Sequence, residues 1–246
     1  MLSRLARLLT AVAATAALIA APAQAQFACT GVPGHVQSPV EIDRSQNCGP
    51  ATPAIEIHYN TADGVVQFRD KNSNSAVDSH DDIAFVPSVP GQYIRYGGIR
   101  YDLTEVHYHF RAEHKFAGEV FAPAEAHFVH RRTPTGKPVV LGVLLDGVAT
   151  SAGAHQHILE NAPPTFLVPW PVGGIDVASM LPANKASYRY YGSLTSDPYT
   201  DVDWVVFNDR LQAKSQTIGN LHARFGPAGN KRGLQPVAPR IYHGHP

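Results

Sequence analysis

Short strand-like segments separated by turn residues constrain the fold of this chain more than any other feature of its sequence. Residues 54–59 (AIEIHY) and 64–69 (GVVQFR) alternate in polarity, which is the pattern of a half-buried strand. Residues 137–145 (KPVVLGVLL) and 203–207 (DWVVF) are apolar runs with the length of buried strands. The 20 glycines and 20 prolines punctuate such segments throughout the chain. The pattern predicts a mostly β protein.

Helical patterns are few and short. Residues 151–161 form one candidate, which two prolines end, and residues 176–181 and 215–224 form two more. No internal repeat and no linker divides the chain, and 246 residues suffice for one large domain with a substantial core. The sequence therefore predicts a β-rich single domain with peripheral helices.

The N-terminal segment has the features of a secretory signal. Two arginines precede an apolar stretch at residues 8–21, and residues 23–25 (AQA) form a small-x-small cleavage site. We expect residues 1–25 to be removed on export and residues 26–246 to form the functional domain. No later apolar run is long enough to span a bilayer. We therefore expect a soluble exported protein, periplasmic or secreted, with no membrane span.

The charge of the chain bears on its partners. The full chain has a formal net charge of +0, and removal of residues 1–25 takes away two arginines and no acid, which leaves −2. There is no basic tract, so nothing in the sequence supports binding to nucleic acid or to anionic lipid.

The two cysteines, Cys29 and Cys48, are expected to pair in an oxidising compartment. The disulfide would close a loop of about 20 residues and stabilise the fold by roughly 3 kcal/mol. Neither cysteine lies near a histidine-rich segment in the sequence, so we interpret the pair as structural. The alternative is two unpaired thiols.

Histidines in two strand-like segments, EVHYHF and EAHFVH, are the main candidates for chemistry. His107 and His109 point to one face, because side chains at i and i+2 of a strand share a face. The turn-like residues 115–124 allow the second segment to fold back, so that His127 meets this pair while His130 packs on the opposite face. Three imidazoles on rigid strands leave one tetrahedral position open, as catalytic zinc requires. The alternative is a set of half-buried histidines satisfied by hydrogen bonds.

Six motifs, taken in order, resemble those of the α-class carbonic anhydrases, especially the exported bacterial ones. They are QSPVEI (37–42), HYH (107–109), EH (113–114), EAHFVH (125–130), YGSLTS (191–196) and NKRGLQPVAPR (230–240). The likeness extends from Val36 to Arg240. It implies a large central twisted, mainly antiparallel sheet with short peripheral helices. It also implies zinc-dependent reversible hydration of carbon dioxide to bicarbonate and a proton, by attack of a zinc-bound hydroxide.

The resemblance assigns roles to individual residues. His107, His109 and His127 match the zinc ligands. Thr195 matches the residue that accepts a hydrogen bond from the hydroxide, and Glu113 matches the acid that accepts the proton of Thr195. An apolar wall for carbon dioxide is matched by Val129, Val140, Leu194 and Trp204. Ser196 matches a hydroxyl that helps to place bicarbonate. The groups that support the ligands from behind are matched by Glu105, Glu125 and Asn230.

Two departures from the family pattern bear on the site. Tyr199 lies in the region where exported members usually place their second cysteine. Glu105 stands where the family has a glutamine. Its carboxylate either makes the adjacent ligand more basic or is a partly solvated strand residue of no special effect.

The remaining histidines are given less specific interpretations. We expect His114 to make a structural hydrogen bond, and His155 and His157 to be solvated on a surface helix. No histidine follows the strand at residues 65–69 until His80, so we expect proton transfer to limit the maximal rate. The alternative is that His80 folds back into the cleft.

Two other classes of protein share part of this pattern. A catalytically weak or silent carbonic-anhydrase-like binding module generally lacks a zinc histidine, whereas this chain keeps all three. A cupin-type metalloprotein is less compatible, because the spacing of His107, His109 and Glu113 fits only the first half of the cupin pattern. The expected small-molecule partner is carbon dioxide or bicarbonate, and the expected assembly is a monomer or homodimer.

Overall fold

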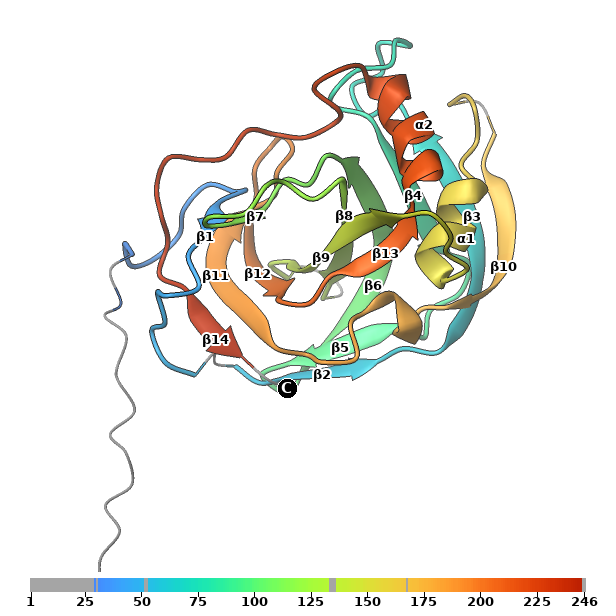
Figure 1. Ribbon diagram of the computed structural model, residues 1–246. Coiled ribbons are helices and arrows are strands. Elements are labelled where there is room, and N and C mark those ends of the chain that lie inside the picture. Colours follow the sequence, from blue (N-terminus) through green and yellow to red (C-terminus); the bar gives the residue numbers. More distant parts are fainter. Residues whose placement is uncertain (1–28, 30, 51–52, 133–135, 167, 245–246) are drawn as a thin grey trace, which may run out of the picture.

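The computed structural model describes residues 29, 31–50, 53–132, 136–166 and 168–244. The expected signal segment, residues 1–25, lies outside the described residues. The described chain is mostly β, with one 12-stranded mixed sheet at its centre (Figure 1). The prediction of a single, β-rich domain is confirmed.

Nine strands form the main path of this sheet. In spatial order they are β10 (Trp170–Asp176), β3 (Thr61–Arg69), β4 (Asp82–Pro87), β6 (Ile99–Phe110), β8 (Ala124–Arg131), β9 (Val139–Val148), β12 (Asp201–Phe207), β11 (Ser187–Ser193) and β14 (Tyr242–Gly244). Three more strands join at the side: β5 (Tyr93–Tyr96) pairs with β6, β2 (Ile55–His58) pairs with β5, and β13 (Leu211–Lys214) pairs with β9.

The sheet is mainly antiparallel, as expected. Among the described strands of this sheet, the parallel pairs are β12 with β9 and β13 with β9. A separate two-stranded parallel sheet joins β1 (Glu41–Ile42) to β7 (Lys115–Phe116).

The helices are short and lie on one side of the sheet. Helix α1 (Ala154–Glu160) packs on β10 and β13, and α2 (Ser215–Phe225) packs on β6, β9 and β13 (Figure 1). The helical segment predicted at residues 176–181 is a single 3₁₀ turn, Ala178–Met180. Within the described part of the chain, no helix has the length and apolar character needed to cross a membrane.

Strand alternation divides the interior into two clusters on opposite faces of the sheet. In β6, Val106 and Tyr108 point into the larger cluster, which the helices cover. The odd-numbered residues His107 and His109 therefore point to the other face. That face carries the smaller cluster, which includes Trp204 of β12.

One expectation about histidines is wrong. His155 is not solvated: it is 3% exposed, because α1 turns it inward between the sheet and the 3₁₀ turn. Its Nδ1 lies 3.0 Å from the hydroxyl of Tyr108, and its Nε2 lies 2.9 Å from the carbonyl oxygen of Met180. His157, on the outer side of the same helix, is exposed as expected.

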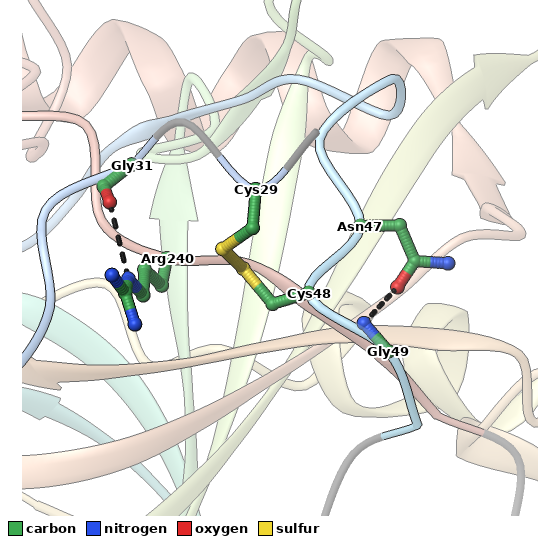
Figure 2. Close-up of a disulfide and its surroundings, with 6 residues drawn as sticks. All are labelled: Cys29, Gly31, Asn47, Cys48, Gly49 and Arg240. Atoms are coloured by element: carbon green, nitrogen blue, oxygen red, sulfur yellow. Dashed lines mark hydrogen bonds between the residues drawn. A yellow bond between two sulfur atoms is a disulfide. The ribbon is translucent and has the colours of Figure 1, made fainter. Parts of the chain in front are cut away.

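A disulfide and backbone hydrogen bonds connect the chain around Cys29 and Cys48 to the C-terminal residues near Ile241. Cys29 and Cys48 form the expected disulfide, with their Cα atoms 4.8 Å apart (Figure 2). Next to the disulfide, the Cys48 amide donates to the carbonyl of Ile241 at 2.9 Å, and the Arg240 guanidinium donates to the carbonyl of Gly31 at 3.4 Å. Neither cysteine lines a cavity at the strand histidines, so we interpret the crosslink as part of the framework.

Candidate metal centre

The antiparallel pairing of β6 and β8 brings three histidines together. His107 lies directly opposite His127 in this ladder, and His109 is two residues further along β6 on the same face. One ring nitrogen from each residue lies within 4.8 Å of the others. All three side chains are buried. The convergence predicted from strand alternation is therefore present.

Hydrogen bonds behind the rings determine which nitrogen each histidine offers. Nδ1 of His107 faces a Glu105 carboxylate oxygen at 2.9 Å, and Nδ1 of His109 faces the Asn230 carbonyl oxygen at 2.7 Å. Nε2 of His127 faces a Glu125 carboxylate oxygen at 2.9 Å. These oxygens are acceptors, so each of these nitrogens carries the proton. The lone pairs therefore reside on Nε2 of His107, Nε2 of His109 and Nδ1 of His127.

This donor set fits zinc. Nε2 of His109 and Oε2 of Glu113 are buried without any hydrogen-bond partner, and they lie 3.5 Å apart. A buried polar atom without a partner is costly, and the unpaired lone pair of His109 is what a metal ligand requires. Burial also disfavours the imidazolium form, and it lowers the pKa of His107 and lowers that of His127 to about 4. Three neutral imidazoles with lone pairs free are what a catalytic zinc ion binds.

The buried carboxylate of Glu125 accepts four hydrogen bonds next to the histidines. It accepts the backbone N–H groups of Glu113 and His114, both at 2.8 Å, and ring N–H groups from His114 at 2.7 Å and His127 at 2.9 Å. Burial alone would raise the pKa of Glu125, but these donors and imidazoles hold it well below its usual value. Gly142 leaves room for the carboxylate, since a Cβ there would lie 3.0 Å from Oε1.

His114 belongs to the support of the site and does not form a second metal centre. Its nitrogen atoms lie close enough to Glu125 and His127 to suggest a metal cluster. Both are already engaged, however, Nδ1 with Glu125 and Nε2 with the Tyr190 hydroxyl at 2.7 Å. The structural hydrogen bond expected for His114 is therefore present.

Glu105 is held against a ligand, which contradicts a purely solvated role. Besides His107, it contacts the guanidinium of Arg69 through both carboxylate oxygens. Burial raises the pKa of Glu105, but the hydrogen bonds from His107 and Arg69 outweigh burial and hold that pKa far below its usual value. Sequence reasoning did not single out Arg69, because it lies 36 residues from Glu105 along the chain.

A cavity of about 130 Å³ opens onto the histidines. Thr195, Ser196 and Glu113 line it together with His107 and His109, and so does His80. Within the described residues no hydrogen bond joins Thr195 to Glu113. One carboxylate oxygen of Glu113 instead accepts the backbone N–H of Arg232 at 2.7 Å, while the other faces the histidines.

The apolar residues expected beside the site lie together. Val129, Val140 and Trp204 belong to the smaller buried cluster, and Leu194 packs against it. Val129 and Leu194 also line a second cavity, of about 290 Å³, which His107 borders. The indole N–H of Trp204 donates to the Ser193 carbonyl at 2.8 Å, which anchors the start of the loop that carries Thr195.

The chain is similar in sequence and in fold to proteins of one known family. Residues 23–237 match the family model described as eukaryotic-type carbonic anhydrase. A carbonic anhydrase of Neisseria gonorrhoeae is 29% identical over 214 residues, which cover 85% of this chain and 77% of that protein. A carbonic anhydrase of a Nostoc species is 28% identical over 166 residues, which cover 62% of this chain and 57% of that protein. The structure of a hyperthermostable carbonic anhydrase from a hydrothermal vent chimney superposes with a TM-score of 0.71 at 29% identity, covering 85% of this chain and 87% of that one.

Proposed function

The chain belongs to the eukaryotic-type, or α-class, carbonic anhydrase family, and on this premise we propose that it catalyses the zinc-dependent, reversible hydration of carbon dioxide. The products are bicarbonate and a proton. One observation carries the proposal: three buried imidazoles converge with their lone pairs on the same side, and Nε2 of His109 has no partner.

The proposed ligands are His107, His109 and His127. A zinc ion bound there supplies a nucleophile at neutral pH by acidifying a water molecule, chemistry for which carbonic anhydrase is itself the reference case. The three residues behind the rings fix the tautomer of each ligand and its orientation: Glu105 behind His107, Asn230 behind His109 and Glu125 behind His127. These three contacts hold the ligand rings in place in the absence of metal.

Thr195 and Glu113 are proposed to orient the nucleophile. Both line the cavity at the histidines, and Glu113 keeps one carboxylate oxygen without a partner. If that oxygen accepts a hydrogen bond from the Thr195 hydroxyl, the hydroxyl oxygen can accept a hydrogen bond only from the nucleophile, and this contact aims the nucleophile at the substrate. Ser196, on the same cavity wall, would contact the charged product.

Carbon dioxide is proposed to rest against the apolar wall. Val129, Val140 and Trp204 are almost completely buried, and Leu194 covers them at the site. The transfer of a small apolar molecule from water to such a surface costs little free energy. The transfer of charged bicarbonate to the same surface is unfavourable, because the ion loses its hydration. The wall would therefore favour the binding of carbon dioxide over that of bicarbonate beside His107.

The protein is proposed to act outside the cytoplasm. Residues 1–25 would be the signal peptide and residues 26–246 the mature domain, placed in the periplasm or secreted. The Cys29–Cys48 disulfide supports this location, because such bonds persist in oxidising compartments. The two alternatives, a silent binding module and a cupin, are not favoured, since all three histidines converge within the fold of this family.

Two alanine variants test the proposal. His127→Ala should lose tightly bound zinc and carbon dioxide hydration, measured by metal analysis and by stopped-flow pH change. His130→Ala is the matched control, since it lies on the same strand but faces away and contacts the Tyr59 hydroxyl. It should keep zinc and most of the activity. Wild-type protein that binds no zinc, or equal loss in both variants, would overturn the assignment.

A further inference from the structure

A partly buried ion-pair array lies behind His107. The guanidinium of Arg69, on β3, lies between two acids of neighbouring strands. It donates from Nε and Nη2 to the two oxygens of Asp82, both at 2.6 Å, and from Nη2 to Glu105 at 3.0 Å, with a further contact from Nη1 to Glu105. Glu105 in turn contacts Nδ1 of His107. A continuous path of charged contacts therefore leads from Asp82 to the metal ligand.

The array is balanced in charge. Asp82 is 2% exposed and Glu105 is 23% exposed at the side chain, and each contributes one negative charge. Arg69 contributes one positive charge, and Lys71 contributes another from the cavity rim, 3.5 Å from Asp82. Partly buried charges are weakly screened by solvent, so an imbalance here would be felt at the adjacent ligand.

We propose that Arg69, together with Lys71, offsets the charge of Glu105 and Asp82 behind His107 and thereby sets the zinc affinity of the site. This inference rests on the proposed zinc site and extends it to a residue that does not touch the metal. Glu105 supplies the acceptor behind the ligand, and Arg69 pairs with Glu105 so that this acceptor adds no net negative charge at His107.

The proposal predicts opposite effects for the two members of the pair. Arg69→Gln leaves two acids with only Lys71 to offset them, so the site attracts a cation more strongly and zinc should bind about tenfold tighter. Glu105→Gln leaves the guanidinium unbalanced near His107, so zinc should bind about tenfold more weakly. Tenfold is the low end of the range typical of residues behind metal ligands. The double variant removes both charges and should return to within about threefold of wild type.

Arg69→Lys separates charge from geometry. It keeps the positive charge but loses the forked donor that spans both acids. If charge balance governs affinity, Arg69→Lys binds zinc like the wild type. Arg210→Gln is the matched control: this arginine also pairs with two acids, Glu119 and Asp146, but lines neither cavity at the histidines. It should leave zinc affinity unchanged.

Zinc affinity is measured on the metal-stripped full chain by competition with a chelator of known affinity, and urea unfolding of the same samples reports whether each variant is folded. Opposite signs for the single variants, cancelling in the double variant, support the proposal. Weaker binding in both Arg69→Gln and Arg69→Lys overturns it, because Arg69 would then act as a geometric brace. If Arg69→Gln does not fold, tight binding in Arg69→Lys still supports the proposal and weak binding still overturns it. Wild-type chain that binds zinc without hydrating carbon dioxide would defeat the proposed function but not this inference.

Discussion

Replacement of the buried acid Glu125 by glutamine tests how the site is supported without changing any ligand. The carboxylate accepts two backbone N–H groups and two ring N–H groups at 2.7 to 2.9 Å. A glutamine side chain has nearly the same shape but offers one oxygen and one NH2 group. In Glu125→Gln, at least two of the four donors must therefore face another donor.

The cost follows from the number of donors left unsatisfied. Each buried donor without an acceptor costs about 1–3 kcal/mol, so two of them cost about 2–6 kcal/mol. For a chain of this size, about 1 kcal/mol corresponds to 2–4 °C in Tm, which predicts a loss of roughly 5–20 °C. If the ring of His127 is one of the unsatisfied donors, its tautomer is no longer fixed, and zinc affinity should fall about 10–100-fold.

The assay is thermal and urea unfolding of the metal-free chain, together with chelator competition for zinc. Glu119→Gln is the control, since Glu119 pairs with Arg44 and Arg210 away from the histidines. It should change Tm by only a few degrees and leave zinc affinity intact. Wild-type stability and zinc affinity in Glu125→Gln would refute the conclusion that an ionised Glu125 organises this part of the site.

Three further predictions follow from the cavity and from the buried histidines. Thr195→Ala and Glu113→Ala should keep zinc yet hydrate carbon dioxide far more slowly, and near-normal rates in both would remove the orienting role. Because His80 lies in the cavity wall, it is favoured as the group that accepts the proton released by the reaction. His80→Ala should therefore lower kcat but not kcat/KM, and imidazole buffer should restore kcat. An unchanged kcat in this variant would contradict the role of His80. Burial lowers the pKa of His155 from 6.5 to about 4, so the unfolded chain binds a proton in this interval that the folded chain does not, and stability is lost as pH falls from 6.5 to 4. Between pH 6.5 and 4.5 the metal-free wild type should therefore lose about 2–3 kcal/mol more than His155→Gln in urea unfolding, and equal losses would refute the assignment.

Local pattern was sufficient to predict which of the strand histidines share a face. In a strand, successive side chains point to opposite faces, so the spacing of His107 and His109 places both on one face whatever surrounds them. The same rule separates His127 from His130, and the structure places these two on the faces expected. The mostly β class followed from the same alternation, and the order of the motifs identified the family.

Contacts between distant segments were not predictable in this way. The carbonyl that holds His109 belongs to Asn230, 121 residues away, and the Arg69 that balances Glu105 comes from a strand two positions across the sheet. His155 was expected on the surface because a helix of seven residues carries too weak a periodicity to show which face it buries.

The sequence by itself determined which side chains share a face, because the strand repeat is a property of the local backbone. It thereby placed His107 and His109 on one face of their strand and His127 and His130 on opposite faces of theirs. Only the tertiary structure decided that His127 lies opposite His107, which oxygens stand behind the imidazoles, which charges cancel and that His80 reaches the cavity. Strand order and register decide these contacts, and both depend on burial of apolar surface across the whole sheet rather than on any short segment.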